Sequence, residues 1–171
     1  MHDSAGPTLW TIGHSALESE EFFRLLAAQR IDVLIDVRSQ PFSRFAPQAN
    51  RDVLEHATKA HGIRYEYRGV DLGGRPADPA MLLKSGKPDY ARMGDAAGYR
   101  RSLDELKVLS RAQRVCILCS EEDPGRCHRG LLVSETLARA GCAVLHIRHD
   151  GAVERHDEMK SRITGGQLSL F

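Results

Sequence analysis

This chain lacks any apolar run long enough to cross a bilayer. Residues 1–9 also lack the basic segment followed by an apolar segment that marks a secretory signal. We therefore predict a cytoplasmic protein without membrane contact. In that compartment its four cysteines are expected to be thiols rather than disulfides.

The chain also lacks an excess of charge of one sign, because its formal net charge is only +1. It therefore carries no overall basic footprint for nucleic acid. The glycine patterns of a P-loop and of a dinucleotide-binding fold are missing as well, and we predict no bound cofactor. What the chain does have is 171 residues, of which 42% are hydrophobic and 27% are charged. This composition predicts one globular domain with its own core.

Short apolar runs alternate with segments of helical periodicity along the chain. The predicted strands cover residues 8–13, 31–37, 63–67, 115–119 and 142–147. The predicted helices cover residues 17–30, 51–61, 98–114, 128–140 and 154–163. Strands that alternate with helices favour a mostly parallel sheet with helices on both faces. We therefore predict a single α/β domain over residues 1–164.

Residues 70–98 break this alternation. The segment is rich in residues that interrupt helices and strands, namely Gly73, Gly74, Pro76, Pro79, Gly86, Pro88, Gly94 and Gly98. Such a long irregular insertion is either a functional loop or a small inserted subdomain. The pair Gly73–Gly74 indicates a tight turn or a close approach of the backbone to a ligand.

Polar residues gather where the predicted strands end. They are His14 after the first strand, Asp36, Arg38, Ser43 and Arg44 after the second, Arg68 after the third, and Glu121, Cys127, His128 and Arg129 after the fourth. Open α/β sheets bind ligands at the carboxyl ends of their strands. We therefore expect these residues to form the site.

The segment 119–129, CSEEDPGRCHR, is the strongest chemical block. Cys127 and His128 stand where a helix is predicted to begin, and a thiol in such a place has a lowered pKa. Cys127 is therefore a candidate nucleophile, although free cysteine is also a common core residue. Glu121 is the better candidate for a general acid or base, or else it forms a salt bridge. Arg129 can clamp a phosphate or carboxylate.

Cys116, Cys119, Cys127 and His128 also raise the question of a zinc site. Cys116 and Cys119 lie three residues apart on a predicted strand, so their side chains are expected to point to opposite faces. A zinc-binding C-x-x-C pair comes from a turn instead. We therefore predict no metal.

Asp36 ends a buried strand, which is a costly place for a carboxylate unless it is paired or functional. Arg38 is the expected partner, and the pair can also serve only to pin the loop. Residues 38–68 carry six basic and three acidic residues with aromatic residues between them. That pattern suits nucleic acid or a nucleotide, as well as an ordinary solvated surface. His14 can act as an acid or base, position a phosphate, or make a structural hydrogen bond.

Four ordered blocks of the chain resemble the bacterial DUF488 family. They are TIGHS at 11–15, LIDVRSQPFSRF at 34–45, GIRYEY with LGG at 62–67 and 72–74, and LCSEEDPGRCHR at 118–129. The resemblance implies that these blocks form one site. It implies no particular reaction.

The last five residues read QLSLF and comprise Gln167, Leu168, Ser169, Leu170 and Phe171. This pentapeptide resembles the motif with which bacterial replication and repair proteins dock on the DNA polymerase sliding clamp. Its apolar anchors can fill pockets of a groove, and Gln167 can bond the rim. The preceding Gly165–Gly166 pair predicts a flexible tail over 165–171. The alternative is an apolar terminus that folds back on its own core.

The leading hypothesis from the sequence is an enzyme that is tethered to the sliding clamp and acts on DNA, a nucleotide or a damaged base. Tethering raises the local concentration on DNA, which is consistent with a nearly neutral protein. A non-catalytic clamp-binding adaptor is the first alternative. A thiol-dependent sulfur- or redox-transfer enzyme that uses Cys127 is the second.

Overall fold

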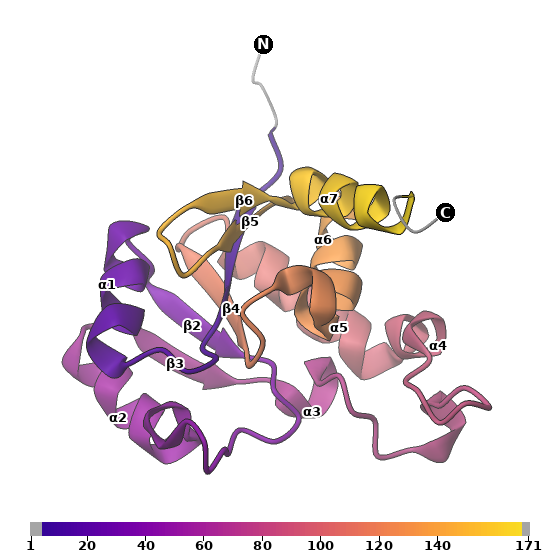
Figure 1. Ribbon diagram of the computed structural model, residues 1–171, viewed down its shortest axis with the longest axis horizontal. Coiled ribbons are helices and arrows are strands. Elements are labelled where there is room, and N and C mark those ends of the chain that lie inside the picture. The colour runs from indigo at the N-terminus through magenta and orange to yellow at the C-terminus, as the bar shows by residue number, and fades with distance from the viewer. Residues whose placement is uncertain (1–4, 169–171) are drawn as a thin grey trace.

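The computed structural model describes residues 5–168, and it contains one sheet with the strand order β3-β2-β4-β1-β5-β6 (Figure 1). The strands are β1 (Thr8–Gly13), β2 (Val33–Asp36), β3 (Arg64–Tyr67), β4 (Val115–Cys119), β5 (Ala143–Ile147) and β6 (Val153–Arg155). The first five strands are parallel, and β6 runs antiparallel to β5. The prediction of a single α/β domain with a mostly parallel sheet is confirmed.

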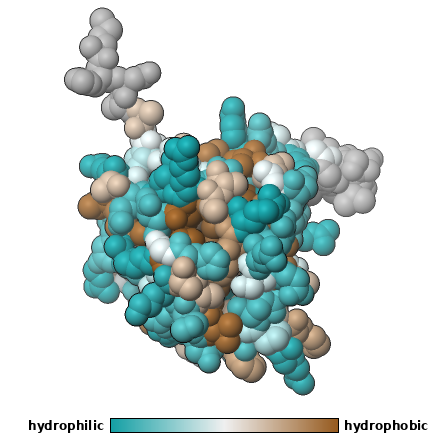
Figure 2. Space-filling model, turned by 90° about the vertical axis from the view of Figure 1, so that its left-hand side faces the viewer, coloured by the Kyte–Doolittle hydropathy of each residue, from teal (hydrophilic) through white to brown (hydrophobic). Residues whose placement is uncertain are grey.

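Two layers of helices cover the sheet, one on each face. On one face, α1 (Ser19–Ala28) and α2 (Arg51–Ala60) pack on a core that includes Trp10, Leu34 and Cys116. On the other face, α5 (Ala97–Leu109) and α6 (Glu135–Arg139) pack on a separate core. Strand residues alternate between the two cores because successive side chains point to opposite faces. The surface on the side of α1 and α2 is mostly hydrophilic with scattered hydrophobic patches (Figure 2).

The irregular insertion predicted at 70–98 is present between β3 and α5. It contains the end of α3 (Gly69–Leu72), the short turn η2 (Pro79–Met81) and α4 (Tyr90–Asp95). A single bridge pairs Leu82 with Pro88. In Figure 1 this segment projects at the lower right, beyond α4. A further short turn, η1 (Pro47–Ala49), precedes α2.

The helix predicted at 128–140 is less regular than expected. The turn η3 (Pro124–Arg126) is followed by a π-helical segment, η4 (Arg129–Ser134), which then continues as α6. The Ser134 hydroxyl donates to the carbonyl of Arg129 at 2.6 Å inside this segment. π-helical turns are rare and are often found at functional sites.

The end of the chain also differs from the prediction of a helix at 154–163. After β5 the chain turns at Gly151, which has a φ of 86°, and returns as β6. The helix α7 (His156–Leu168) follows directly. A strand of three residues is too short to show its periodicity in the sequence, which is why β6 was not predicted.

The predicted docking tail falls at the limit of the described residues. Gly165 and Gly166, where the sequence predicts a hinge, belong to α7. Ser169, Leu170 and Phe171 lie outside the described residues. The prediction of a clamp-binding tail therefore stays a prediction. No helix among residues 5–168 is both long and apolar enough to span a membrane.

Candidate functional site

The site lies at the carboxyl end of β4. In the sheet, β4 stands between β2 and β1. The helices that follow β1 and β2 cover one face, whereas η4 and α6, which follow β4, cover the other. The chain therefore leaves β4 toward the face opposite to that of both neighbours. Such a change of direction opens a crevice at the strand ends, where α/β proteins bind ligands.

A cleft of about 440 Å³ occupies this position. Six predicted site residues line it, namely Arg38, Ser43, Gly74, Glu121, Cys127 and His128. The cleft is also lined by Ser39, Gln40, Phe42, Arg75, Pro88, Tyr90, Cys119, Ser120 and Arg126. Most of these residues come from segments that the sequence analysis assigned to strand ends or to the irregular insertion.

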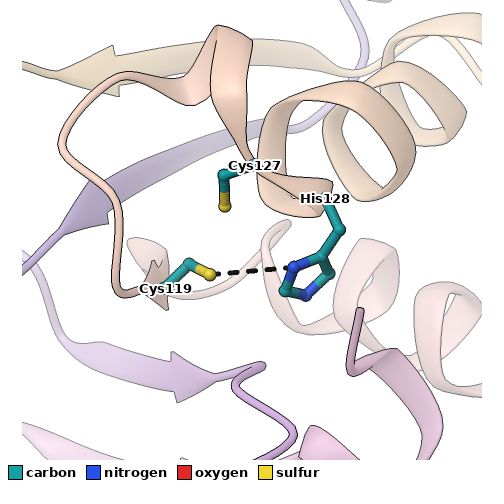
Figure 3. A group of neighbouring side chains, drawn as sticks. All are labelled: Cys119, Cys127 and His128. Carbon is teal, nitrogen blue, oxygen red and sulfur yellow. Dashed lines mark hydrogen bonds between the residues drawn. The ribbon is translucent and has the colours of Figure 1, made fainter. Parts of the chain in front are cut away.

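Three buried side chains that line the cleft lie close together: Cys119 at the end of β4, and Cys127 and His128 before η4 (Figure 3). The Cys119 sulfur lies 3.7 Å from Nδ1 of His128. One donor atom from each of the three residues lies within 4.8 Å of the other two. All three side chains are buried. The group is therefore a compact set of two sulfur atoms and one nitrogen, which is a donor set suited to a metal ion as well as to thiol chemistry.

The two thiols differ in their tendency to ionise. The neighbouring Cys119 thiol, together with His128 and Arg129, lowers the pKa of Cys127 to about 3, although burial opposes this shift. The same pairing and burial raise the pKa of Cys119. The backbone N–H of Arg129 also donates to the Cys127 sulfur at 3.3 Å. Cys127 thus lies where the sequence placed it, just before a helix, and its thiolate is the favoured form.

His128 is held in one orientation. Its Nε2–H donates to the carbonyl of Val37 at 3.1 Å, which leaves the Nδ1 lone pair facing the Cys119 sulfur. Gly74, from the predicted insertion, packs on the imidazole, and a Cβ at Gly74 would lie 2.5 Å from the ring atoms of His128. The close backbone approach predicted for Gly74 is therefore made to a protein side chain. Gly73 approaches Ser39 in the same way.

Glu121 lies at the mouth of the cleft, where it is exposed. One of its carboxylate oxygens accepts a hydrogen bond from the Cys119 thiol at 3.5 Å. The other two acidic residues of the block are engaged elsewhere, since Glu122 binds Arg148 and Asp123 binds Arg162. Glu121 is therefore the carboxylate of this segment that is available to a ligand.

Asp36 and His14 form a buried network with Arg38, which lines the cleft. The Asp36 carboxylate accepts hydrogen bonds from Nε and Nη2 of Arg38, at 2.9 and 2.7 Å, and from the Tyr65 hydroxyl at 2.5 Å. Nη1 of Arg38 donates to Nε2 of His14 at 3.1 Å, and His14 donates from Nδ1 to the Ser15 carbonyl. Burial lowers the pKa of His14, which favours the neutral ring. The expected Asp36–Arg38 pair is present, and its placement assigns Asp36 and His14 to positioning Arg38.

Arg129 has a different place from the one expected of a phosphate clamp. Its side chain is fully buried. The guanidinium donates to the Thr11 hydroxyl at 2.5 Å and to the carbonyls of Glu121 and Glu122 at 2.8 and 3.2 Å. Arg129 therefore holds the loop that carries Glu121, and it does not line the cleft.

Three further predictions concern residues outside the cleft or at its edge. Arg68 pairs with Glu66 and Glu105 beside a separate hollow of about 730 Å³ between β3 and α5. Arg44 is exposed, and its guanidinium carbon lies 5.9 Å from the centre of the Phe45 ring. Ser43 lines the cleft, but its hydroxyl accepts from the backbone of the same loop. The structure thus does not bring Arg44 or Arg68 to the site.

Cys119, Arg75, Tyr90 and Arg126 line the cleft but were not among the site residues predicted from the sequence. Cys119 belongs to an apolar run, VCILC, that reads as core. Arg75 and Arg126 are exposed cleft residues, and neither forms an ion pair within the described part of the chain. The sequence gives no sign that these two arginines lie away from acidic side chains in the folded protein.

Comparison with known proteins gives the family of the chain. The family model described as "Domain of unknown function DUF488" matches residues 18–136, which is more than half of the chain. No curated protein and no solved structure matched the chain. The matched range contains three of the four blocks in full. It also contains the residues that line the cleft. The chain belongs to the DUF488 family.

Proposed function

We propose that this protein is an enzyme that acts on a DNA base or a nucleotide and is tethered to the bacterial sliding clamp. The observation that carries this proposal is the composition of the cleft. Reactive groups at its base, Cys119, Cys127 and His128, lie beside Glu121 and a rim of arginine and phenylalanine side chains.

The rim suits a nucleotide in both charge and shape. Phe42 lines the cleft and is 72% exposed, which is unusual for so large an apolar side chain. An exposed aromatic ring offers a surface on which a base can stack. Arg75 and Arg126 stand in the same cleft, and each can bond the oxygen atoms of a phosphate. Together they supply the local positive charge that the nearly neutral chain lacks as a whole.

Cys119, Cys127 and His128 are buried, unlike this rim. Glu121 is an exposed carboxylate within reach of a bound ligand and is the proposed general acid or base. The sulfur atoms of Cys119 and Cys127 lie at the floor of the cleft. The nucleobase or sugar of a nucleotide would rest against them. A substrate held by its phosphate at the rim thus presents its base to the reactive groups.

The tether is proposed from the QLSLF sequence at 167–171. The preceding helix α7 is linked to the cleft, because Arg162 pairs with Asp123 in the segment that carries Glu121. Ile163 lies against Gly125 of the same segment, since a Cβ on that glycine would come within 2.9 Å of it. Docking of the tail on a clamp would therefore hold the cleft close to DNA.

The first test compares binding of the intact protein and of a chain without residues 167–171 to a purified bacterial sliding clamp. We expect binding by the intact protein and its loss on truncation. Lys160→Ala, in α7 but outside the motif, is the matched control and should still bind. Absence of binding by the intact protein would contradict the tether.

The second test addresses the cleft. Phe42→Ala should weaken binding of a single-stranded oligonucleotide by about 1–3 kcal/mol, which is the usual contribution of one stacked base. Val108→Ala removes an apolar side chain that is 67% exposed on α5 and should leave the affinity unchanged. Equal affinities of the two variants would contradict the proposed nucleic-acid ligand. Glu121→Gln should then abolish turnover of a modified base or nucleotide, whereas a non-catalytic adaptor would tolerate it.

The close approach of two sulfur atoms favours a second candidate function, a thiol-dependent transfer enzyme that uses Cys127. It predicts rapid alkylation of Cys127 near neutral pH and full activity without residues 167–171. Cys127→Ser would abolish this activity. Slow alkylation of the reduced, metal-free protein would contradict it.

A further inference from the structure

We infer that Cys119, Cys127 and His128 bind a zinc ion with one coordination position open to the cleft. The two thiols and the imidazole come from the end of β4 and from the residues just before η4, and they meet in one compact group (Figure 3). Two cysteines and one histidine, with water in the fourth position, are a ligand set of catalytic zinc. The presence of this site does not depend on the clamp tether.

The distances agree with tetrahedral coordination. Zinc–sulfur bonds of about 2.3 Å and zinc–nitrogen bonds of about 2.0 Å place neighbouring ligand atoms roughly 3.5–3.8 Å apart. The Cys119 sulfur and Nδ1 of His128 are 3.7 Å apart. All three donor atoms lie within 4.8 Å of one another, so small side-chain movements complete the set.

The surroundings hold two of the three ligands as a metal site requires. The Nε2–H of His128 donates to the Val37 carbonyl, which presents Nδ1 as the free donor. The backbone N–H of Arg129 donates to the Cys127 sulfur, and such a bond stabilises a thiolate ligand. Gly74 packs against the imidazole and prevents it from turning away. Cys127 and His128 are thus oriented before a metal arrives.

The fourth position faces the cleft, where Glu121 is exposed. An oxygen of Glu121 lies 3.5 Å from the Cys119 sulfur, so the carboxylate is within reach of a water bound to the metal. A carboxylate beside a zinc-bound water serves as general acid and base in hydrolytic enzymes. The use of the site, though not its existence, rests on the proposed function.

The reaction class that follows is hydrolysis at an electrophilic carbon of a base or nucleotide. The zinc-bound water gives one proton to Glu121, and the resulting hydroxide forms a new carbon–oxygen bond. The bond between that carbon and the leaving group breaks, and the leaving group takes the electron pair together with the proton from Glu121. Water is the only co-reactant, and no oxidant or reductant is needed.

Cys116 offers a matched control for the test. It is a buried cysteine on the same strand, but it belongs to the core under α1 and α2 on the opposite face from Cys119. The reduced full chain, produced without a metal-binding tag, is loaded with Zn²⁺, desalted and analysed for metal by mass spectrometry. We expect one zinc ion per chain in the wild type and in Cys116→Ser, and loss of zinc in Cys119→Ser and Cys127→Ser.

Substitution with Co²⁺ gives an independent reading of the ligands. We expect a thiolate-to-cobalt charge-transfer band in the wild type that is weakened in each of the two variants. Circular dichroism of the same samples separates loss of ligands from loss of fold. Glu121→Gln should keep its zinc, since it is not a ligand.

Failure of the reduced wild type to retain zinc would overturn the inference, and so would full retention in both cysteine variants. A disulfide between Cys119 and Cys127 that forms in place of metal uptake would also overturn it and would favour redox chemistry. Zinc binding together with equal DNA affinities of Phe42→Ala and Val108→Ala would leave the metal site standing and reject the nucleic-acid function. The two proposals therefore fail separately.

Discussion

Arg162 donates two hydrogen bonds to the carboxylate of Asp123, with nitrogen–oxygen distances of 2.7 and 3.0 Å. Asp123 follows Glu121 by two residues and accepts from the Gly125 backbone at 2.9 Å, so it organises the turn that closes the site. The same guanidinium binds Glu154 of β6. The last helix, the last strand and the cleft are joined through one side chain.

Arg162→Ala should therefore destabilise the protein in a pH-dependent way. Because Arg162 is 41% exposed, solvent screening limits the loss to about 1 kcal/mol or less. The bond from Arg162 lowers the pKa of Asp123 to about 2. The stabilisation is thus complete above the ordinary carboxyl pKa of about 4 and is lost as the pH falls toward 2. Urea unfolding at pH 6 and pH 2.5 should show a smaller difference between wild type and variant at the lower pH.

Arg100→Ala serves as the control for this measurement. Arg100 pairs with Asp95, and both side chains are more than half exposed. Its removal should change stability little at either pH. An Arg162→Ala protein that behaves like Arg100→Ala would show that the link between α7 and the site loop contributes nothing.

Asp36→Asn should be far more damaging than a change at an exposed ion pair. Asp36 is fully buried and pairs with Arg38, which is 3% exposed. Loss of its charge leaves the guanidinium without a buried partner, at an expected cost of about 3–5 kcal/mol. Tyr65→Phe removes only one hydrogen bond to the same carboxylate and should cost about 1.5–3 kcal/mol. Chemical denaturation of both variants tests this order, and a loss for Asp36→Asn that is below that for Tyr65→Phe would refute it.

Gly74→Ala should disturb the site through His128. The added methyl group would lie 2.5 Å from the imidazole, which is itself bonded to Val37 and cannot move freely. We expect a destabilisation of about 1–3 kcal/mol from this overpacking. Gly94→Ala is the matched control, because its methyl group would meet only Leu132, at an ordinary 3.8 Å. In α4 that change should be neutral or stabilise by about 0.5–1 kcal/mol. Melting temperatures of the two variants that shift equally would contradict the contact.

His146 should make the protein sensitive to mild acid. It accepts from the Thr11 hydroxyl at 2.7 Å and donates to His156 at 3.1 Å, and His156 in turn bonds Glu135 at 2.8 Å. Burial, with the nearby Arg129 charge, lowers the pKa of His146 to about 2. The unfolded chain binds a proton below about pH 6.5 that the folded protein excludes, so stability falls with acidity by at most about 1.4 kcal/mol per pH unit.

His146→Gln should reduce the change of unfolding free energy with pH by the contribution of one proton. It should also lower the stability at every pH. Unfolding free energies between pH 7.5 and 5 measure the slope directly. His56→Gln, an exposed change on α2, should leave the slope as it is in the wild type. An unchanged slope in His146→Gln would mean that His146 is protonated in the folded protein.

The sheet could be predicted from the sequence because its signal is local. The observed β4 has the bounds that its apolar run predicts, and the period of two correctly placed Cys116 and Cys119 on opposite faces. Several of the residues that follow the strands, among them Arg38, Glu121 and Cys127, line the cleft at the carboxyl ends of the strands. Boundaries were wrong where the chain is irregular, as at η4 and β6.

Side-chain partners across long separations could not be predicted. Arg129 looks like a free cation in the sequence, yet its guanidinium binds Thr11, which is 118 residues away in the chain. Cys119 has the sequence pattern of a core residue. The sequence does not show that the loop from Ser120 to Arg126 brings Cys127 next to it. The sequence argument against a metal depends on the strand geometry of Cys116 and Cys119, whereas the residues that lie beside Cys119 in the structure, Cys127 and His128, follow the loop.

The strand β3 forms an outer edge of the sheet. Exposed strand edges can pair with strands of other molecules and thereby start aggregation. This edge is only four residues long, and it carries Arg64 and Glu66, whose side chains pair at 3.1 Å. A foreign strand that added here would have to desolvate these charges. The short charged edge thus disfavours pairing with a strand of another molecule.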